Sequence, residues 1–277
     1  MRAALGDPAR MESILERALG HDVTFATLAM GAQTMAHSLA LLEIALTRQG
    51  GLVVIGLNEL TLGVGSAEQE DMLDRYPLAV SSTAAGTLVR ETIGSRGRLA
   101  AFGPLWSCRF YVLRASTFLR NLVAGRRPTY EPRYPFELTA AGKAGKGFPR
   151  VPFDRVDARV RKYLTASPQD IERVLDQLRA IIGRLKQRPD VRMVLVLDPL
   201  NPRVFATREK QLQLAALRQR IERLAAEQSI PLLTGLRDTA LPAEAFLDYG
   251  HVVGEPNRDL LRQALARQLV GQLGQLD

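Results

Sequence analysis

The chain has 277 residues, 46% of them hydrophobic and 24% charged, which suits one large α/β domain or two small ones in an ordinary globular protein. Its single cysteine, Cys108, excludes an internal disulfide and a thiolate metal cluster, and three widely spaced histidines argue against a histidine metal site. The formal net charge of +8 fits either an Arg-rich solvated surface or contact with an anionic surface such as a membrane or polysaccharide. Because no zinc-finger or aromatic RNA-binding signature accompanies the charge, we expect no nucleic acid partner.

The first 60 residues predict a helix followed by a β-α-β unit, which is the repeating unit of a parallel sheet. The first helix starts at the N-cap Asp7, has Pro8 at its first position and stops at Gly20. An apolar, β-branched strand then runs into Gly31, and an amphipathic helix leads to a second strand; these three elements cover Asp22–Met30, Ala32–Arg48 and Leu52–Ile55.

Residues 60–165 interrupt this alternation, and we interpret them as an insertion. Apolar stretches predict that it is mostly helical, and residues 126–155, rich in Pro, Gly and basic side chains, predict a long irregular segment. The glycine- and lysine-rich residues 142–147 lack the spacing of a nucleotide-binding loop and are interpreted as a mobile basic loop.

Regular alternation returns after the insertion, where a helix capped by Ser167 is followed by strand, helix, strand and helix. The elements are predicted at Ser167–Arg188, Val191–Leu200, Arg208–Gln228, Ile230–Leu236 and Asn257–Leu273. The pattern predicts one three-layer α/β/α domain over residues 1–277 with a doubly wound, mainly parallel sheet. Such folds bind ligands at the carboxyl ends of their strands, where Gly31, Asn58 and Asp198 fall.

Two short motifs could carry chemistry. Asn58 ends the apolar strand in Gly56-Leu57-Asn58-Glu59, either as a turn former or as a side chain held to touch a ligand. Asp248 and His251 lie three residues apart before the last helix, so the carboxylate can bond Nδ1–H of the imidazole and leave Nε2 as a base. The alternative is a surface turn with an incidental histidine.

In this order and at these strand ends, the motifs resemble the blocks of the SGNH/GDSL hydrolase superfamily. The resemblance implies a flavodoxin-like SGNH fold over residues 1–60 and 167–277, and it leaves the insertion unexplained. It implies that the N–H of Gly31 and the side chain of Asn58 form an oxyanion hole, with Gly56 in support. It also implies that Asp248 and His251 are the acid and base of a catalytic triad, and that no metal or organic cofactor is needed.

The sequence departs from the family pattern in two ways. Glu59 replaces the usual aspartate, and the nucleophilic serine expected before the first helix is missing, since Gly6-Asp7-Pro8 has proline in its place. None of Ser13, Ser38 and Ser66 is predicted at a strand end facing the histidine.

Two interpretations follow from this gap. In the first, the domain is an ester hydrolase or O-acyltransferase acting on an acylated carbohydrate or lipid-linked substrate, similar to membrane-anchored bacterial members, with a chain that starts just after its serine. The alternative is a non-catalytic, degenerate domain that binds or scaffolds in cell-envelope polysaccharide metabolism. As written, the chain shows no signal peptide and no apolar stretch of roughly 20 residues, so its sequence predicts a cytoplasmic protein. If an N-terminal anchor is missing, the prediction is instead the cell envelope or periplasm.

Overall fold

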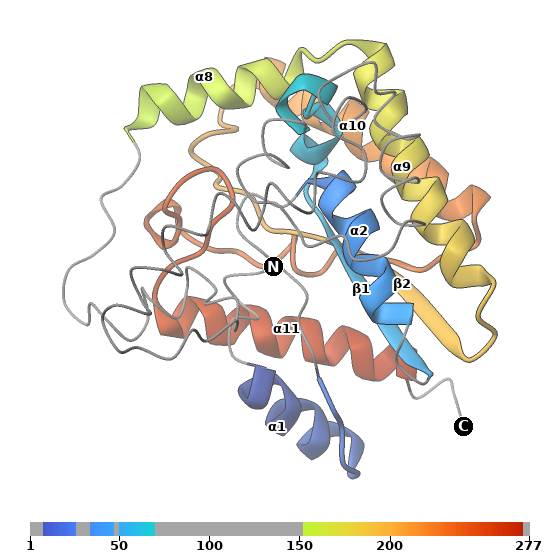
Figure 1. The fold of residues 1–277 in the computed structure, drawn as a ribbon. Helices are drawn as coiled ribbons and strands as arrows, with labels where there is room; N and C mark the ends of the chain where they lie inside the picture. Colours follow the sequence, from blue (N-terminus) through green and yellow to red (C-terminus); the bar gives the residue numbers. More distant parts are fainter. Residues whose placement is uncertain (1–7, 26–33, 47–49, 70–151, 274–277) are drawn as a thin grey trace, which may run out of the picture.

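The computed structural model describes residues 8–25, 34–46, 50–69 and 152–273, and it shows a parallel sheet with helices packed against it (Figure 1). In the described residues the sheet has three strands in chain order: β1 (Gly51–Leu57), β2 (Val191–Leu197) and β3 (Leu232–Leu233). β1 and β2 pair along their full length, from Gly51 opposite Val191 to Leu57 opposite Leu197. The predicted parallel α/β architecture is therefore confirmed at this level.

Six helices of two turns or more surround this sheet in the described part of the chain. They are α1 (Pro8–Leu19), α2 (Met35–Leu46), α8 (Phe153–Leu164), α9 (Pro168–Lys186), α10 (Arg208–Glu227) and α11 (Glu255–Leu273), with two 3₁₀ turns, η1 (Glu59–Gly63) and η3 (Ala243–Ala245). No helix among the described residues is long and apolar enough to cross a membrane.

Strand β2 divides the apolar core because its successive side chains point to opposite faces of the sheet. Leu195 and Leu197 join a cluster built with α2, α8, α9 and α10, whereas Val194 and Val196 join a second cluster built with α1 and α11. All four side chains are at most 2% exposed. Helices therefore cover both faces, and the loops that follow the strands are left to form a site.

The predicted starts of α9 and α10 and the predicted stop after α1 are confirmed. Ser167 Oγ accepts the backbone N–H of Asp170, and Pro168 is the first residue of α9. Gly20 follows α1 with φ of +77°, a left-handed conformation that suits glycine. The proposed cap Asp7 lies outside the described residues.

Several predicted elements need correction. Helix α2 begins at Met35 rather than Ala32, α11 begins at Glu255 rather than Asn257, and β2 ends at Leu197 rather than Leu200. Residues 22–25 form no strand, and the rest of the strand predicted over Asp22–Met30 lies outside the described residues. β3 is shorter than predicted because residues 234–239 turn back on themselves, with Asp238 N–H donating to the carbonyl of Thr234. Helix α8 begins at Phe153, inside the predicted irregular segment, and the remainder of that segment up to residue 151 is not described.

Helix α8 packs so closely on η1 that only glycine fits at position 63. A Cβ there would lie 2.0 Å from the carbonyl oxygen of Tyr163, near the end of α8. The helix buries Val156, Val160 and Tyr163 on one face at helical spacing. This apolar periodicity in the sequence could therefore have predicted the helix, despite the arginines between these residues.

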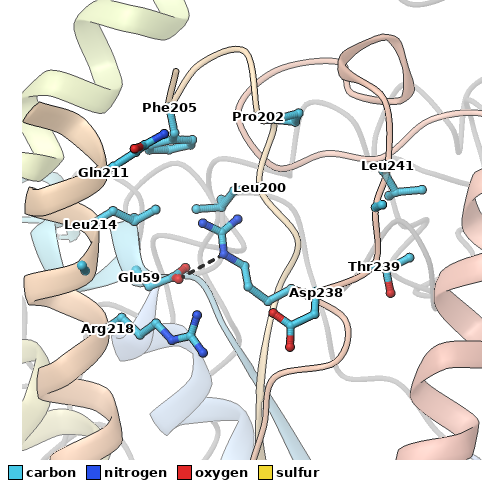
Figure 2. A pocket seen from close by; sticks show the side chains of 13 residues that line it. Glu59, Leu200, Pro202, Phe205, Gln211, Leu214, Arg218, Asp238, Thr239 and Leu241 are labelled. Atoms are coloured by element: carbon cyan, nitrogen blue, oxygen red, sulfur yellow. Dashed lines mark ion pairs between the residues drawn. The ribbon is translucent and has the colours of Figure 1, made fainter. Parts of the chain in front are cut away.

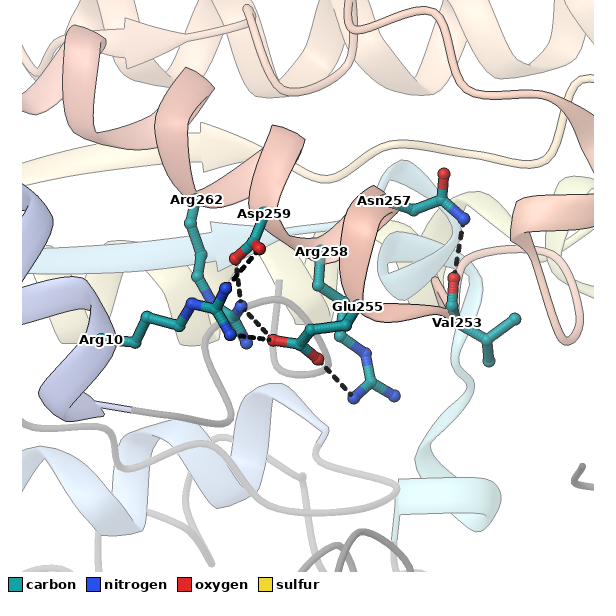
Figure 3. A network of polar contacts seen from close by, with 7 residues as sticks. All are labelled: Arg10, Val253, Glu255, Asn257, Arg258, Asp259 and Arg262. Atoms are coloured by element: carbon teal, nitrogen blue, oxygen red, sulfur yellow. Dashed lines mark hydrogen bonds and ion pairs between the residues drawn. The ribbon is translucent and has the colours of Figure 1, made fainter. Parts of the chain in front are cut away.

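Two arginines, one buried in α11 and one exposed on α1, share two carboxylates at the start of α11 (Figure 3). Arg262 of α11 is 2% exposed and pairs with Glu255 at 2.5 Å and with Asp259 at 2.7 Å. Arg10 of α1 pairs with the same two carboxylates, at 3.0 and 2.5 Å. These contacts hold the start of α1 against the start of α11, and the two helices lie side by side in Figure 1.

We expect Arg262→Ala to lower the free energy of unfolding by about 2 kcal/mol, because it removes a buried stem and the more buried of the two cations that the carboxylates share. Arg10→Ala should cost less than about 1 kcal/mol, because its side chain is 45% exposed and solvent screens the pairs. Urea unfolding of both variants measures the difference, and equal losses would show that burial of Arg262 adds nothing.

Candidate functional site

Asn58 stands directly at the carboxyl end of β1, and its two side-chain atoms have different surroundings. Oδ1 accepts the backbone N–H of Leu60 at 2.9 Å and so caps η1. This bond fixes the amide so that Nδ2 points away from the cap. Within the described residues Nδ2 has no hydrogen-bond partner, which leaves a fixed donor at the edge of the sheet.

Asp248 and His251 form the predicted pair within one turn before α11. Nδ1 of His251 lies 2.8 Å from Asp248 Oδ2, while Asp248 Oδ1 accepts the backbone N–H groups of Gly250 and His251, each at 2.9 Å. The side chain of Asp248 is 13% exposed, and that of His251 is 46% exposed. The carboxylate is therefore anchored, and the far edge of the imidazole is open to solvent.

The charge state of Asp248 determines which nitrogen of His251 can act as a base. Burial raises the pKa of Asp248, but the hydrogen bond and charge of His251 and the two backbone donors outweigh it, so that this pKa lies below its usual value. An ionised carboxylate only accepts hydrogen bonds, so Nδ1 of His251 must carry the shared hydrogen. In the neutral ring the lone pair is then on Nε2.

The turn that carries this pair lies against Asn58. A Cβ built on Gly250 would lie 3.1 Å from Asn58 Nδ2 and 3.7 Å from Leu200 Cδ2. Glycine at position 250 therefore lets the turn approach the amide without pressing on it. The structure thus brings together three of the predicted site residues, Asn58, Asp248 and His251.

Asn201, which the sequence analysis did not select, holds the turn in place from the loop after β2. Its side chain is buried; Nδ2 donates to the carbonyl of Asp248 at 3.0 Å, and Oδ1 accepts the N–H of Arg203 at 3.0 Å. Its backbone N–H donates to the carbonyl of Tyr249 at 2.9 Å. Only the strand-loop position of Asn201 in the sequence could have suggested this role.

Tyr249 packs the turn against helix α8. Its ring meets Tyr163 edge to face, with centroids 6.4 Å apart, and lies 6.5 Å from the ring of His251. Burial and the nearby charge of Asp248 raise the pKa of Tyr249 to about 12, so its hydroxyl stays neutral. Tyr163 in turn donates to Glu68 Oε1 at 2.6 Å. Aromatic contact therefore limits the orientations open to the imidazole.

The remaining predicted site residues are placed differently. Gly31 lies outside the described residues, and Gly56 lies within β1 opposite Val196. Asp198 follows β2, and its N–H donates to the carbonyl of Leu57 at 2.8 Å, which ties the ends of the two strands together. In the described ranges no group of histidine, cysteine and acidic residues could hold a metal ion.

No described serine takes the nucleophile's place beside His251. Ser13 and Ser38 donate to carbonyls of their own helical turns, Ser167 caps α9 and Ser66 accepts from Arg173. Ser229 follows the end of α10 with φ of 51°. The serines between residues 70 and 151 lie outside the described residues.

Comparisons of this chain with protein-family models, with curated proteins and with solved structures found no match.

We expect Asn201→Ala to lower the free energy of unfolding by about 2 kcal/mol, because it leaves the carbonyl of Asp248 and the N–H of Arg203 without a buried partner. Hydrogen exchange at the amides of Gly250 and His251 should accelerate as the turn loosens. Asn257→Ala is the matched control, since Asn257 bonds the carbonyl of Val253 beyond the turn. Unchanged exchange in Asn201→Ala would contradict this positioning role.

The lowered pKa of Asp248 predicts how its contribution to stability depends on pH. Because the folded-state pKa lies below the unfolded value, the carboxylate stabilises the fold above about pH 4, and this stabilisation is lost as pH falls through the folded-state pKa. Thermal unfolding of the unmodified chain and of Asp248→Asn should therefore differ most near neutral pH and converge in acid. A difference that grows in acid would contradict the assignment.

Proposed function

We propose that this chain is the α/β domain of an SGNH-like ester hydrolase or O-acyltransferase, whose substrate is an acylated carbohydrate or lipid-linked molecule. The observation that carries the proposal is the meeting of a fixed amide donor, Asn58, with an oriented acid–base pair, Asp248 and His251, at the carboxyl edge of a parallel sheet. A donor fixed before the reaction suits an oxyanion, and a histidine whose Nδ1 is held by a carboxylate suits a general base.

The proposed reaction is acyl transfer through a serine. The serine Oγ attacks the acyl carbonyl while His251 Nε2 takes its proton, and Asn58 Nδ2 donates to the oxygen that becomes negative. Collapse of this intermediate breaks the ester bond, and His251 returns the proton to the departing alcohol. Water in a hydrolase, or an acceptor hydroxyl in a transferase, then releases the acyl group by the same steps. Gly31 is the second oxyanion donor that the resemblance suggests.

The serine is proposed to come from the N-terminal side of α1. Arg10, in the first turn of that helix, pairs with Glu255, only four residues after His251 in the sequence. The first turn of α1 therefore lies near the start of α11, the helix that follows the Asp248–His251 turn. A strand leading into α1 would add to a parallel sheet, in the flavodoxin-like order that the resemblance suggests.

A non-catalytic binding domain, with a role in cell-envelope polysaccharide metabolism, is the second candidate. One observation favours it: none of the serines in the described ranges bonds to His251. The same donor and acceptor groups would then bind a ligand carbonyl or hydroxyl without cleaving it.

The decisive experiment compares the 277-residue chain with a form extended in frame by the codons upstream of Met1, using p-nitrophenyl acetate and acetylated polysaccharide as substrates. We expect hydrolysis only in the extended form, where a serine is present. In that form Asn58→Ala should lower kcat by roughly 100- to 1000-fold and Asp248→Asn by on the order of 10⁴-fold. His251→Ala should abolish turnover, and His21→Ala is the matched control.

Each other outcome has a definite meaning. An inactive extended form, or an upstream stop codon together with an inactive 277-residue chain, would reject the enzyme and leave the binding domain. Activity of the 277-residue chain that requires His251 would move the nucleophile into residues 1–277. Activity that survives His251→Ala would contradict the proposed base.

A further inference from the structure

A cavity of about 430 Å³ opens beside the candidate site, at the carboxyl ends of all three strands (Figure 2). Its walls come from η1, from the loop after β2, from α10 and from the segment 237–241 that follows β3. Its volume falls within the roughly 300–1,000 Å³ of typical small-molecule sites. Doubly wound sheets bind their ligands at this edge.

The floor of the cavity holds a carboxylate that the described residues do not satisfy. Glu59 is 0% exposed, and neither of its carboxylate oxygens has a hydrogen bond within the described residues. Arg237 forms an ion pair with this carboxylate, with its Nε 3.4 Å from Glu59 Oε1, which Figure 2 marks with a dashed line from Glu59. Burial raises the pKa of Glu59, against the charges of Arg237 and Arg218. Buried carboxylates need donors, and a hydroxyl-bearing ligand in the cavity would supply them.

The charges that line the cavity cancel, which bears on what the cavity can hold. Glu59 and Asp238 are acidic, and Arg218 and Arg237 are basic. Arg218 also pairs with Glu222 at 2.8 Å, which weakens the attraction that it offers to an anion. A charged ligand would be repelled by the two lining side chains of its own sign, whereas a neutral ligand would not be repelled.

The lining offers donors, acceptors and an apolar wall together. The guanidinium groups and Gln211 donate, the carboxylates accept, and Phe205 and Leu214 supply apolar surface. Hydroxyl groups both donate and accept, and the C–H faces of a sugar ring pack on apolar side chains. We propose that this cavity is a binding site for a neutral sugar, with Glu59 accepting from its hydroxyls and Arg237 donating to them.

The cavity lies next to the candidate active site, but sugar binding in it does not depend on catalysis there. Glu59 follows Asn58 in the chain, and Leu200 both lines the cavity and faces Gly250 in the Asp248–His251 turn. A sugar bound there would lie one side chain away from that turn. Sugar binding and ester cleavage are separate properties, so either one can fail while the other holds.

The test is saturation-transfer NMR and calorimetry on the full chain with glucose, N-acetylglucosamine, glucuronate and inorganic phosphate at millimolar concentrations. We expect a neutral sugar to bind, glucuronate to bind at least about tenfold more weakly, and phosphate not to compete, because the cavity charges are balanced. Glu59→Gln should weaken sugar binding by about tenfold, since a carboxylate acceptor is stronger than an amide.

A cavity-blocking variant and a matched control keep the test valid even if Glu59→Gln fails to fold. Ala215 lines the cavity from an exposed position on α10, so Ala215→Trp should abolish sugar binding without loss of stability. Ala216 is its exposed neighbour outside the lining, and Ala216→Trp should bind sugar normally. The proposal would be overturned if neither neutral sugar binds, or if both tryptophan variants bind sugar equally well. Tighter binding of glucuronate or phosphate than of the neutral sugars would also overturn it.

Discussion

The parallel pairing of β1 with β2 is the constraint on which the rest of the site depends. The two strands run in register to Leu57 and Leu197, and one further backbone bond, from Asp198 N–H to the carbonyl of Leu57, closes the pair. Strands that end together release their loops at the same edge of the sheet. Asn58 and the loop containing Asn201 therefore start side by side. Asn201 then holds the turn before α11 beside these loops, through its backbone bond to Tyr249 and its side-chain bond to Asp248.

The cap formed by Asn58 sends the polar groups of two successive residues to different places. Its Oδ1 starts the 3₁₀ turn, which directs Glu59 into the cavity, while its Nδ2 remains beside Gly250. A strand that simply continued past residue 57 would send alternate side chains to opposite faces of the sheet. The same interaction therefore orders a donor at the Asp248–His251 turn and an acceptor on the cavity floor, so a change at Asn58 should disturb both places.

The sequence predicted the features that depend on near neighbours. The cap at Ser167, the stop at Gly20 and the Asp248–His251 pair each join residues within four positions, where backbone geometry alone brings the groups together. It missed features made by distant segments: the bonds from Asn201 span 47 and 48 residues, and the pairing of Glu59 with Arg237 joins loops after two different strands. β3 was overestimated because apolar content extends to Leu236, whereas local bonds from residues 234–239 end the strand early.

The exposure of the acid–base pair indicates where a missing group must enter. Asp248 is anchored and mostly buried, whereas His251 presents its far edge to solvent, so a reacting hydroxyl must approach from outside the turn. A base in bulk water gains little from its carboxylate, because water screens the interaction and competes for the proton. Arg10 holds the first turn of α1 next to the first turn of α11, the helix that follows the Asp248–His251 turn. A group joined to that end of α1 would act at a high effective concentration, whether it is a nucleophile or a surface that covers a bound ligand.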